Sequence, residues 1–196
     1  MSDRREREPG IEAVVIGGSA GAVTALGAIL GELPASFPPV LVVLHIPATS
    51  PSLLVDVFAP HCRMRVCEAE SFEPILRGSV YFAPPDYHLL VERDHRCSLS
   101  IEPPVRFSRP SVDVLFGSAA TAYGSGLAAV VLTGASDDGA EGLRAVHAAG
   151  GVAIVQEPAS AEATIMPKAA LAAVPSARVV RLSEIARHLL SLAQAS

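Results

Sequence analysis

The sequence predicts an α/β protein: a doubly wound, mostly parallel sheet with helices on both faces and an antiparallel hairpin at one edge. Short aliphatic runs without polar alternation recur along the chain, as in strands that are covered on both faces. Segments with the helical spacing of apolar residues separate these runs, which implies right-handed crossovers. The chain has 196 residues, half of them hydrophobic, so it is long enough to bury one sizeable core.

Five of the apolar runs are predicted to be buried parallel strands: Ala13–Ile16, Val40–Leu44, Leu127–Leu132, Val152–Val155 and Arg178–Val180. A different pattern lies between Ser79 and Ile101. There "VYFAPPDYHLLVERDHRCSLSI" predicts three short strands, joined by turns at Pro84–Pro85–Asp86 and around Asp94. We expect antiparallel pairing in this stretch, at an edge of the sheet.

Helices are predicted between the strands. One begins near Pro110, and another runs from about Asp138 to Ala149 and ends at a pair of glycines. In the last helix, Ser183 is the expected cap. The side chains expected to face the core are Val112, Leu115, Phe116, Ala119, Ala120 and Tyr123 in the first helix and Ile185, Leu189 and Leu192 in the last.

Charge and composition exclude several classes of protein. The net charge of −5 and the scattered Lys and Arg residues argue against nucleic acid as a partner. No apolar run reaches the roughly 18 residues of a membrane span, and "MSDRREREPG" lacks the apolar core of a secretory signal. Cys62, Cys67 and Cys97 form no CxxC pair, so we predict free thiols in a reducing compartment and no metal site. We therefore expect a cytoplasmic protein that does not insert into a membrane. Residues 1–10 are expected to be a flexible tail, and residues 11–196 a single domain.

The glycine-rich turn in "AVVIGGSAGAVTAL" follows the first predicted strand. A dinucleotide fingerprint would need glycine where Ser19 and Ala22 stand, and no Gly-Lys-Ser/Thr sequence marks a phosphate loop. Gly17-Gly18-Ser19-Ala20-Gly21 instead fits G-x-S-x-G, the turn that presents a serine nucleophile. The pentapeptide alone is common, and Ser19 could also be a simple helix cap.

A serine nucleophile needs a base and a group that orients the base. His45 ends the second strand, whereas His61, His88 and His95 fall in the irregular middle of the chain. After the third buried strand, "VVLTGASDDGAEG" brings Asp137 and Asp138 to the same carboxyl edge, where open α/β sheets form their sites. The order Ser…His…Asp differs from that of the α/β-hydrolases. We therefore expect a serine hydrolase that does not belong to the α/β-hydrolases.

Several blocks of the chain, between about Ala13 and Leu190, resemble the catalytic domain of the CheB family of chemotaxis protein-glutamate methylesterases, which also act as glutamine deamidases. These blocks are "IGGSAGA", "LHIP", "VYFAPPDYHL", "RPSVDVLF", "VVLTGASDDGAEG" and "GGVAIVQEPASAEATIMPKAA". The resemblance implies that Ser19 is the nucleophile, that His45 is the general base and that Asp138 orients the histidine. Candidates for binding the oxyanion or lining the site are Ala20, Gly21, Gly134, Ala135 and Ser136.

The chain departs from the family pattern at two places. Thr is frequent in the family where Ala20 stands, and Gly-Met-Gly-Asn-Asp-Gly is common where this chain has "GASDDG". Backbone amides can still serve the oxyanion, so we expect an altered rate rather than an inactive protein. The receiver domain that usually precedes this domain cannot form from the nine residues before Gly10, so the chain is either an excised fragment or, as the Met1 start slightly favours, a stand-alone enzyme.

The resemblance implies an ester hydrolase that works in chemotactic signal transduction. Methylated chemoreceptor helices would be its substrate, with water as the second reactant and no cofactor. Two alternatives remain open at this point. One is a non-catalytic module that binds a nucleotide or a signalling partner, and the other is an esterase of the same chemistry with a non-chemotactic substrate.

Overall fold

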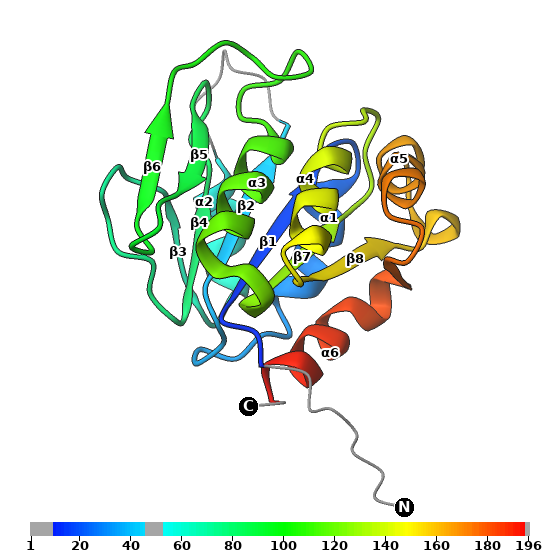
Figure 1. Cartoon of the computed structure of the whole chain (residues 1–196). Coiled ribbons are helices and arrows are strands. Elements are labelled where there is room, and N and C mark those ends of the chain that lie inside the picture. Colours follow the sequence, from blue (N-terminus) through cyan, green and yellow to red (C-terminus); the bar gives the residue numbers. More distant parts are fainter. Residues whose placement is uncertain (1–9, 46–52, 195–196) are drawn as a thin grey trace, which may run out of the picture.

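A computed structural model describes residues 10–45 and 53–194, and these ranges contain a seven-stranded parallel sheet (Figure 1). Its strand order is β3-β4-β2-β1-β7-β8-β9. The strands are β1 (Ala13–Gly18), β2 (Val40–Leu44), β3 (Arg65–Glu68), β4 (Ser79–Phe82), β7 (Leu127–Val131), β8 (Val152–Gln156) and β9 (Arg178–Val180). The predicted fold class is confirmed, and the five predicted parallel strands agree with the observed bounds to within two residues. The expectation that all five are buried is wrong for β9, because this strand lies at the edge of the sheet and Val179 is 51% exposed.

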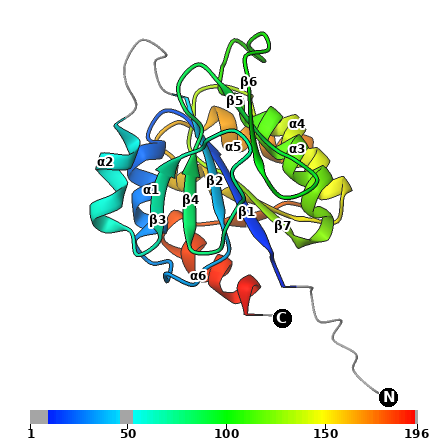
Figure 2. The same ribbon diagram turned by 90° about the vertical axis from the view of Figure 1, so that its left-hand side faces the viewer.

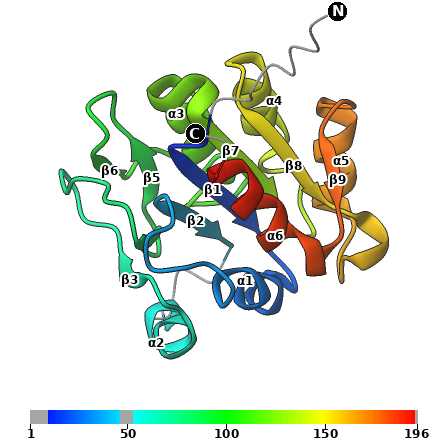
Figure 3. The same cartoon turned by 90° about the horizontal axis from the view of Figure 1, so that it is seen from below.

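Helices cover both faces of the sheet, as the view from below shows (Figure 3). On one face lie α1 (Ala22–Leu30), α2 (Leu54–Phe58) and α6 (Leu182–Ala193), and on the other lie α3 (Val112–Tyr123), α4 (Ala140–Ala148) and α5 (Ile165–Ala173). Strand β1 serves both layers, because its successive side chains point to opposite faces. Val14 and Ile16 pack in the core beneath α1 and α6, whereas Ala13 and Val15 pack beneath α3 and α4. Single turns of 3-10 helix span Ala59–His61, Gly124–Gly126 and Pro158–Ser160.

The expectation of three antiparallel strands after Ser79 is only partly right. Strands β5 (His88–Val91) and β6 (Cys97–Ser100) do form an antiparallel hairpin, a two-stranded sheet beside α3. The first of the three, β4, instead lies parallel between β2 and β3 (Figure 2). Its four residues are all buried, which suits a strand covered on both faces. Strand β3 was not predicted, because it is a partly exposed edge strand with a charged residue at each end and so lacks the aliphatic pattern of the other strands.

Two helix starts also differ from the prediction. Helix α6 begins at Leu182 with Arg181 as its N-cap residue, so Ser183 lies inside the first turn. Helix α4 begins at Ala140, because Gly139 takes a left-handed conformation with φ 98°. Asp138 therefore precedes the helix. The predicted tail, residues 1–10, lies outside the described residues except for Gly10, and no described helix is long and apolar enough to cross a membrane.

The register of the central strands determines where the site can form. Gly18 of β1 pairs with Leu44 of β2, and Gly17 pairs with Val131 of β7. The residues that follow these pairs leave the sheet together at its carboxyl edge. Ser19 and His45 are consequently neighbours, and the backbone N–H of His45 donates to the carbonyl of Gly18 at 3.1 Å.

Candidate active site

Ser19 occupies a tight turn between β1 and α1. Its own N–H donates to the carbonyl of Thr133 at 3.0 Å, and its carbonyl accepts from the N–H of Ala22 at 2.9 Å. Gly21 has a φ of 77°, which favours glycine. A Cβ on Gly134 would lie 3.0 Å from the Cβ of Ser19, so this neighbour must also be small. The turn leaves Ser19 half-buried rather than enclosed.

Thr133 fixes the turn from the side of β7, a role that the sequence reasoning missed. Its hydroxyl donates to the carbonyl of Ala20 at 2.9 Å and accepts from the N–H of Ala163 at 2.8 Å. Its own N–H donates to the buried side chain of Gln156 at 2.9 Å. The only sequence signal was a polar residue at the end of each of two otherwise aliphatic strands. These contacts hold both sides of Ser19 in place.

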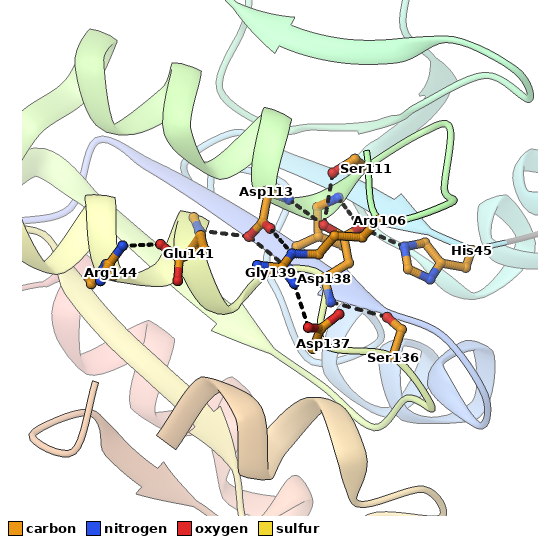
Figure 4. A network of polar contacts seen from close by, with 12 residues as sticks. His45, Arg106, Ser111, Asp113, Ser136, Asp137, Asp138, Gly139, Glu141 and Arg144 are labelled. Atoms are coloured by element: carbon orange, nitrogen blue, oxygen red, sulfur yellow. Dashed lines mark hydrogen bonds and ion pairs between the residues drawn. The ribbon is translucent and has the colours of Figure 1, made fainter. Parts of the chain in front are cut away.

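His45 and Asp138 form a hydrogen-bonded pair (Figure 4). The distance between Nε2 of His45 and Oδ2 of Asp138 is 2.8 Å, and the histidine side chain is 14% exposed. An ionised carboxylate only accepts hydrogen bonds, so Nε2 carries the proton and Nδ1 of the neutral ring keeps its lone pair. In the Ser-His-Asp template the carboxylate contacts Nδ1 instead. Within the described residues, Ser19 Oγ and His45 are not hydrogen-bonded to each other.

Asp138 is buried, and both of its carboxylate oxygens accept hydrogen bonds (Figure 4). Oδ2 accepts from the N–H of Val112 at 2.7 Å, and Oδ1 accepts from the N–H of Asp113 at 2.9 Å and from the hydroxyl of Ser111 at 2.8 Å. Two of these donors are backbone groups at the N-terminus of α3, where the helix dipole also favours an anion. Burial alone would raise the pKa of Asp138, but the hydrogen bonds from His45 and from the start of α3 lower it below its ordinary value. Asp138 is therefore held ionised.

His88 supports this arrangement from β5, although the sequence reasoning placed it in an irregular segment. The ring is 1% exposed, and its Nδ1 accepts from the N–H of Ser111 at 3.2 Å. Nε2 donates to the carbonyl of Pro103 at 3.2 Å, so both nitrogens of a neutral ring are paired. His88 thus fixes the backbone of Ser111, whose hydroxyl binds Asp138. Nothing in the local pattern around His88 signalled this long-range contact.

The neighbouring Asp137 faces away from the histidine. Its carboxylate pairs with Arg106, whose Nε also donates to Oδ2 of Asp113 at 3.1 Å (Figure 4). The other oxygen of Asp113 accepts from the N–H groups of Gly139 and Gly142 at 2.9 and 2.7 Å, and burial raises the pKa of this carboxyl. Of the two adjacent acids, only Asp138 contacts His45.

The remaining site candidates differ in what they can offer an oxyanion. Gly134 uses its N–H on the carbonyl of Ala163 at 3.0 Å, and the Ser136 hydroxyl accepts from the N–H of Asp138 at 3.2 Å. Ala20 and Ala135 are exposed, and their N–H groups have no acceptor among the described residues. These two amides are therefore available to a ligand.

A pocket of about 260 Å³ opens beside this edge and is lined by His45, Asp86, Pro104, Phe107, Ser108, Arg109 and Pro110. A slightly larger one, of about 280 Å³, is bounded by Gly150 and Gly151 before β8 and by Arg178 at the start of β9, at the opposite end of the strands. Of these two pockets, the one of about 260 Å³ is lined by a residue of the candidate site, His45, whereas Ser19 does not line it. Among the described residues, no group of three His, Cys, Asp or Glu side chains could hold a metal ion.

A doubly wound sheet with a histidine–carboxylate pair and a serine turn at its carboxyl edge defines an α/β protein of the hydrolase class. The sequence also matches the CheB methylesterase family over residues 14–189. The chain belongs to the CheB methylesterase family, and it is a carboxylic-ester hydrolase.

Individual relatives agree with this assignment. A protein from Leptospira interrogans is 45% identical over 93% of this chain and 95% of its own length, and its name provisionally assigns it protein-glutamate methylesterase and protein-glutamine glutaminase activity. A protein-glutamate methylesterase/protein-glutamine glutaminase from Rhizobium johnstonii is 39% identical over 90% of this chain, which spans only 49% of that protein. The crystal structure of the Thermotoga maritima CheB methylesterase catalytic domain superposes with a TM-score of 0.88 at 31% identity, covering 93% of this chain and 98% of the other.

Proposed function

We propose that this chain removes methyl groups from glutamyl methyl esters on chemoreceptor helices, with Ser19, His45 and Asp138 as a catalytic triad. The observation that carries the proposal is the hydrogen bond between the partly buried His45 and the buried Asp138. This pair lies beside the Ser19 turn because Gly18 and Leu44 are in register. The names of the relatives support the substrate class. We further propose that residues 11–196 form one catalytic domain that works in the cytoplasm. The proposed reaction needs no cofactor.

The reaction proceeds through an acyl-enzyme. Ser19 Oγ attacks the ester carbonyl carbon while Nδ1 of His45 takes the hydroxyl proton. The same proton then passes to the departing methoxide, which leaves as methanol, and a water molecule activated by His45 releases the free glutamate. Asp138, ionised at neutral pH, keeps the proton of the ring on Nε2 and stabilises the imidazolium that forms.

The free amides of Ala20 and Ala135 are suited to the negative charge that develops on the carbonyl oxygen. Backbone donors of this kind do not depend on side-chain identity. They therefore compensate for the absence of the Thr and Met side chains that the family often has at these two positions. A glutamine side chain would follow the same route with ammonia as the leaving group, and this is the deamidation that the names of the relatives describe.

Methanol release from a methylated chemoreceptor tests this proposal. The intact protein should release methanol, and Ser19→Ala should lower the rate on the order of 10⁴-fold or more. Circular dichroism of the variant verifies that it is folded. Full activity in Ser19→Ala would contradict the covalent mechanism, and binding of the receptor without methanol release would favour a non-catalytic binding module.

A further inference from the structure

The first turns of α3 and α4 pack closely against each other. A Cβ on Gly142 of α4 would lie 3.0 Å from the Cα of Asp113 in α3. The hydroxyl of Ser111, the N-cap residue of α3, donates to Asp138 instead of capping its own helix, and the N-cap residue of α4 is Gly139, which has no side chain. The first N–H groups of both helices therefore need acceptors from outside their own helix.

Each helix receives these acceptors from the other (Figure 4). Asp138, which precedes the N-cap residue of α4, accepts from the N–H groups of Val112 and Asp113 at 2.7 and 2.9 Å. In return, Oδ1 of Asp113 accepts from the N–H groups of Gly139 and Gly142 at 2.9 and 2.7 Å. The acid of the candidate triad is thus one half of a reciprocal exchange between two helix N-termini, and Asp113 is the other half.

Asp113 also anchors the chain on both sides of Asp138. Its Oδ1 binds the N–H of the next residue, Gly139. Its Oδ2 accepts from Nε of Arg106 at 3.1 Å, and Arg106 pairs with the preceding residue, Asp137. Arg106 and Asp137 are 35% and 58% exposed, so this bridge contributes little, whereas the Asp113 side chain is only 10% exposed. The backbone bonds of Oδ1 are therefore the stronger anchor.

Capping α4 alone does not require this arrangement, because an exposed polar residue at the N-cap position would be sufficient. A buried carboxylate loses hydration instead, and burial raises the pKa of Asp113. What the exchange adds is rigidity at Asp138. Its carboxylate is bound to the start of α3, and the backbone that follows it is bound to Asp113 of the same helix. Neither end of this residue can move without breaking hydrogen bonds to α3.

We propose that Asp113 is a positioning residue, which keeps Asp138 within hydrogen-bonding distance of His45 by binding the first N–H groups of α4. The catalytic part of this inference rests on the function proposed above. Small misplacements of reacting groups have large effects on rate, so a residue that contacts neither the histidine nor the ester can still govern kcat.

Two substitutions at Asp113 and one control test the proposal. Asp113→Ala removes the acceptor for the start of α4, whereas Asp113→Asn keeps an oxygen there, although a neutral oxygen is a weaker acceptor. The control is Leu189→Ala, because Leu189 is fully buried on the face of the sheet opposite α3 and α4, so its loss destabilises the fold away from the site. Urea unfolding verifies that each variant is folded and measures the stability it has lost.

The ¹H resonance of the His45 Nε2 proton reports the contact with Asp138 without any substrate. A histidine N–H that donates to a carboxylate resonates downfield, and the signal is assigned by its absence from His45→Gln. It should move upfield in Asp113→Asn, move further in Asp113→Ala and stay in place in Leu189→Ala. An unchanged resonance in every folded Asp113 variant, or an equal change in Leu189→Ala, would overturn the inference.

Methanol release from a methylated chemoreceptor then separates kcat from KM. Asp113→Ala should lower kcat by about 10- to 100-fold and Asp113→Asn by less, with KM nearly unchanged, because other residues line the pocket beside His45. Leu189→Ala should keep the wild-type kcat. A loss that appears in KM alone would overturn the inference. A wild-type chain that releases no methanol would overturn the proposed function, whereas the resonance decides the positioning of Asp138 independently.

Discussion

Asp137 and Asp138 are adjacent in sequence but have different environments. Asp138 is 1% exposed and accepts hydrogen bonds from His45 and the start of α3, whereas Asp137 is exposed and pairs with Arg106. Asp138 directly precedes Gly139, whose left-handed backbone begins the turn into α4. One residue thus faces the site and the other the surface.

Replacing these two acids should have unequal effects on catalysis. Asp138→Asn should lower kcat by about 10³- to 10⁴-fold, because the amide no longer favours the required tautomer of His45. Asp137→Asn should change kcat only a few-fold, since Asp137 has no contact with the ring. Steady-state methanol release measures both. The reverse order of effects would assign the orienting role to Asp137.

Asp138 should also affect stability in a pH-dependent way. Its pKa in the folded protein lies below the ordinary aspartate value of 3.8, so its ionised form stabilises the fold above that value. The stabilisation is lost as the pH falls through the lowered pKa. Urea unfolding measures the free energy of unfolding of wild type and Asp138→Asn from neutral pH to below 3.8. The difference in this free energy between the two proteins should become smaller as the pH falls. A constant difference would mean that Asp138 gains no protection from its donors.

At the scale of elements, the site depends on how closely the turn after β7 approaches the turn after β1. A Cβ on Gly134 would lie 2.0 Å from the sulfur of Met166 and 3.0 Å from the Cβ of Ser19. Met166 is buried in α5, and the contact with Ser19 is made at its Cβ, so a side chain at position 134 would have to displace one or both residues. Glycine at position 134 is therefore required by close approach.

Gly134→Ala should consequently displace Ser19 and lower kcat by about 100-fold, because small misplacements of reacting groups have large effects on rate. Gly117→Ala in α3 is the control, since a Cβ there meets nothing within 4 Å. It should leave kcat unchanged and slightly stabilise the helix. Both are assayed by methanol release. Full activity in Gly134→Ala would show that the Ser19 turn is not held by this contact.

At the scale of the whole molecule, the core beneath α6 should stabilise the fold without affecting the chemistry. Leu189 of α6 is fully buried against the face of the sheet opposite α3. Leu189→Ala should lower the free energy of unfolding by about 2–5 kcal/mol, and Leu190→Ala, which is only half-buried, by less. Urea unfolding measures these changes. Wild-type kcat in both folded variants is expected, and a large loss of kcat in Leu189→Ala would couple α6 to the site.

The sequence alone predicted the fold class, five parallel strands and the antiparallel hairpin, because short aliphatic runs between turn residues indicate strands. Burial on both faces was predicted wrongly only for the edge strand β9. The sequence did not predict β3, whose edge position leaves charged residues in the strand, or the parallel pairing of β4, which depends on partners distant in the chain. At the site, the strand ends indicated Ser19, His45 and the acid pair. The supporting contacts of Thr133, Ser111 and His88 could not be predicted, since they are made between elements that only the tertiary fold brings together.

Ser19 and His45 are expected to act as one catalytic unit, and a double-mutant comparison of kcat tests this expectation. Ser19→Ala and His45→Ala should each lower kcat on the order of 10⁴- to 10⁶-fold, and the double variant should be little slower than either. The reason is that a hydroxyl without its base is a poor nucleophile, and a base without the hydroxyl has nothing to activate. If the two losses multiply in the double variant, or if either single variant keeps full activity, Ser19 and His45 do not act as one catalytic unit.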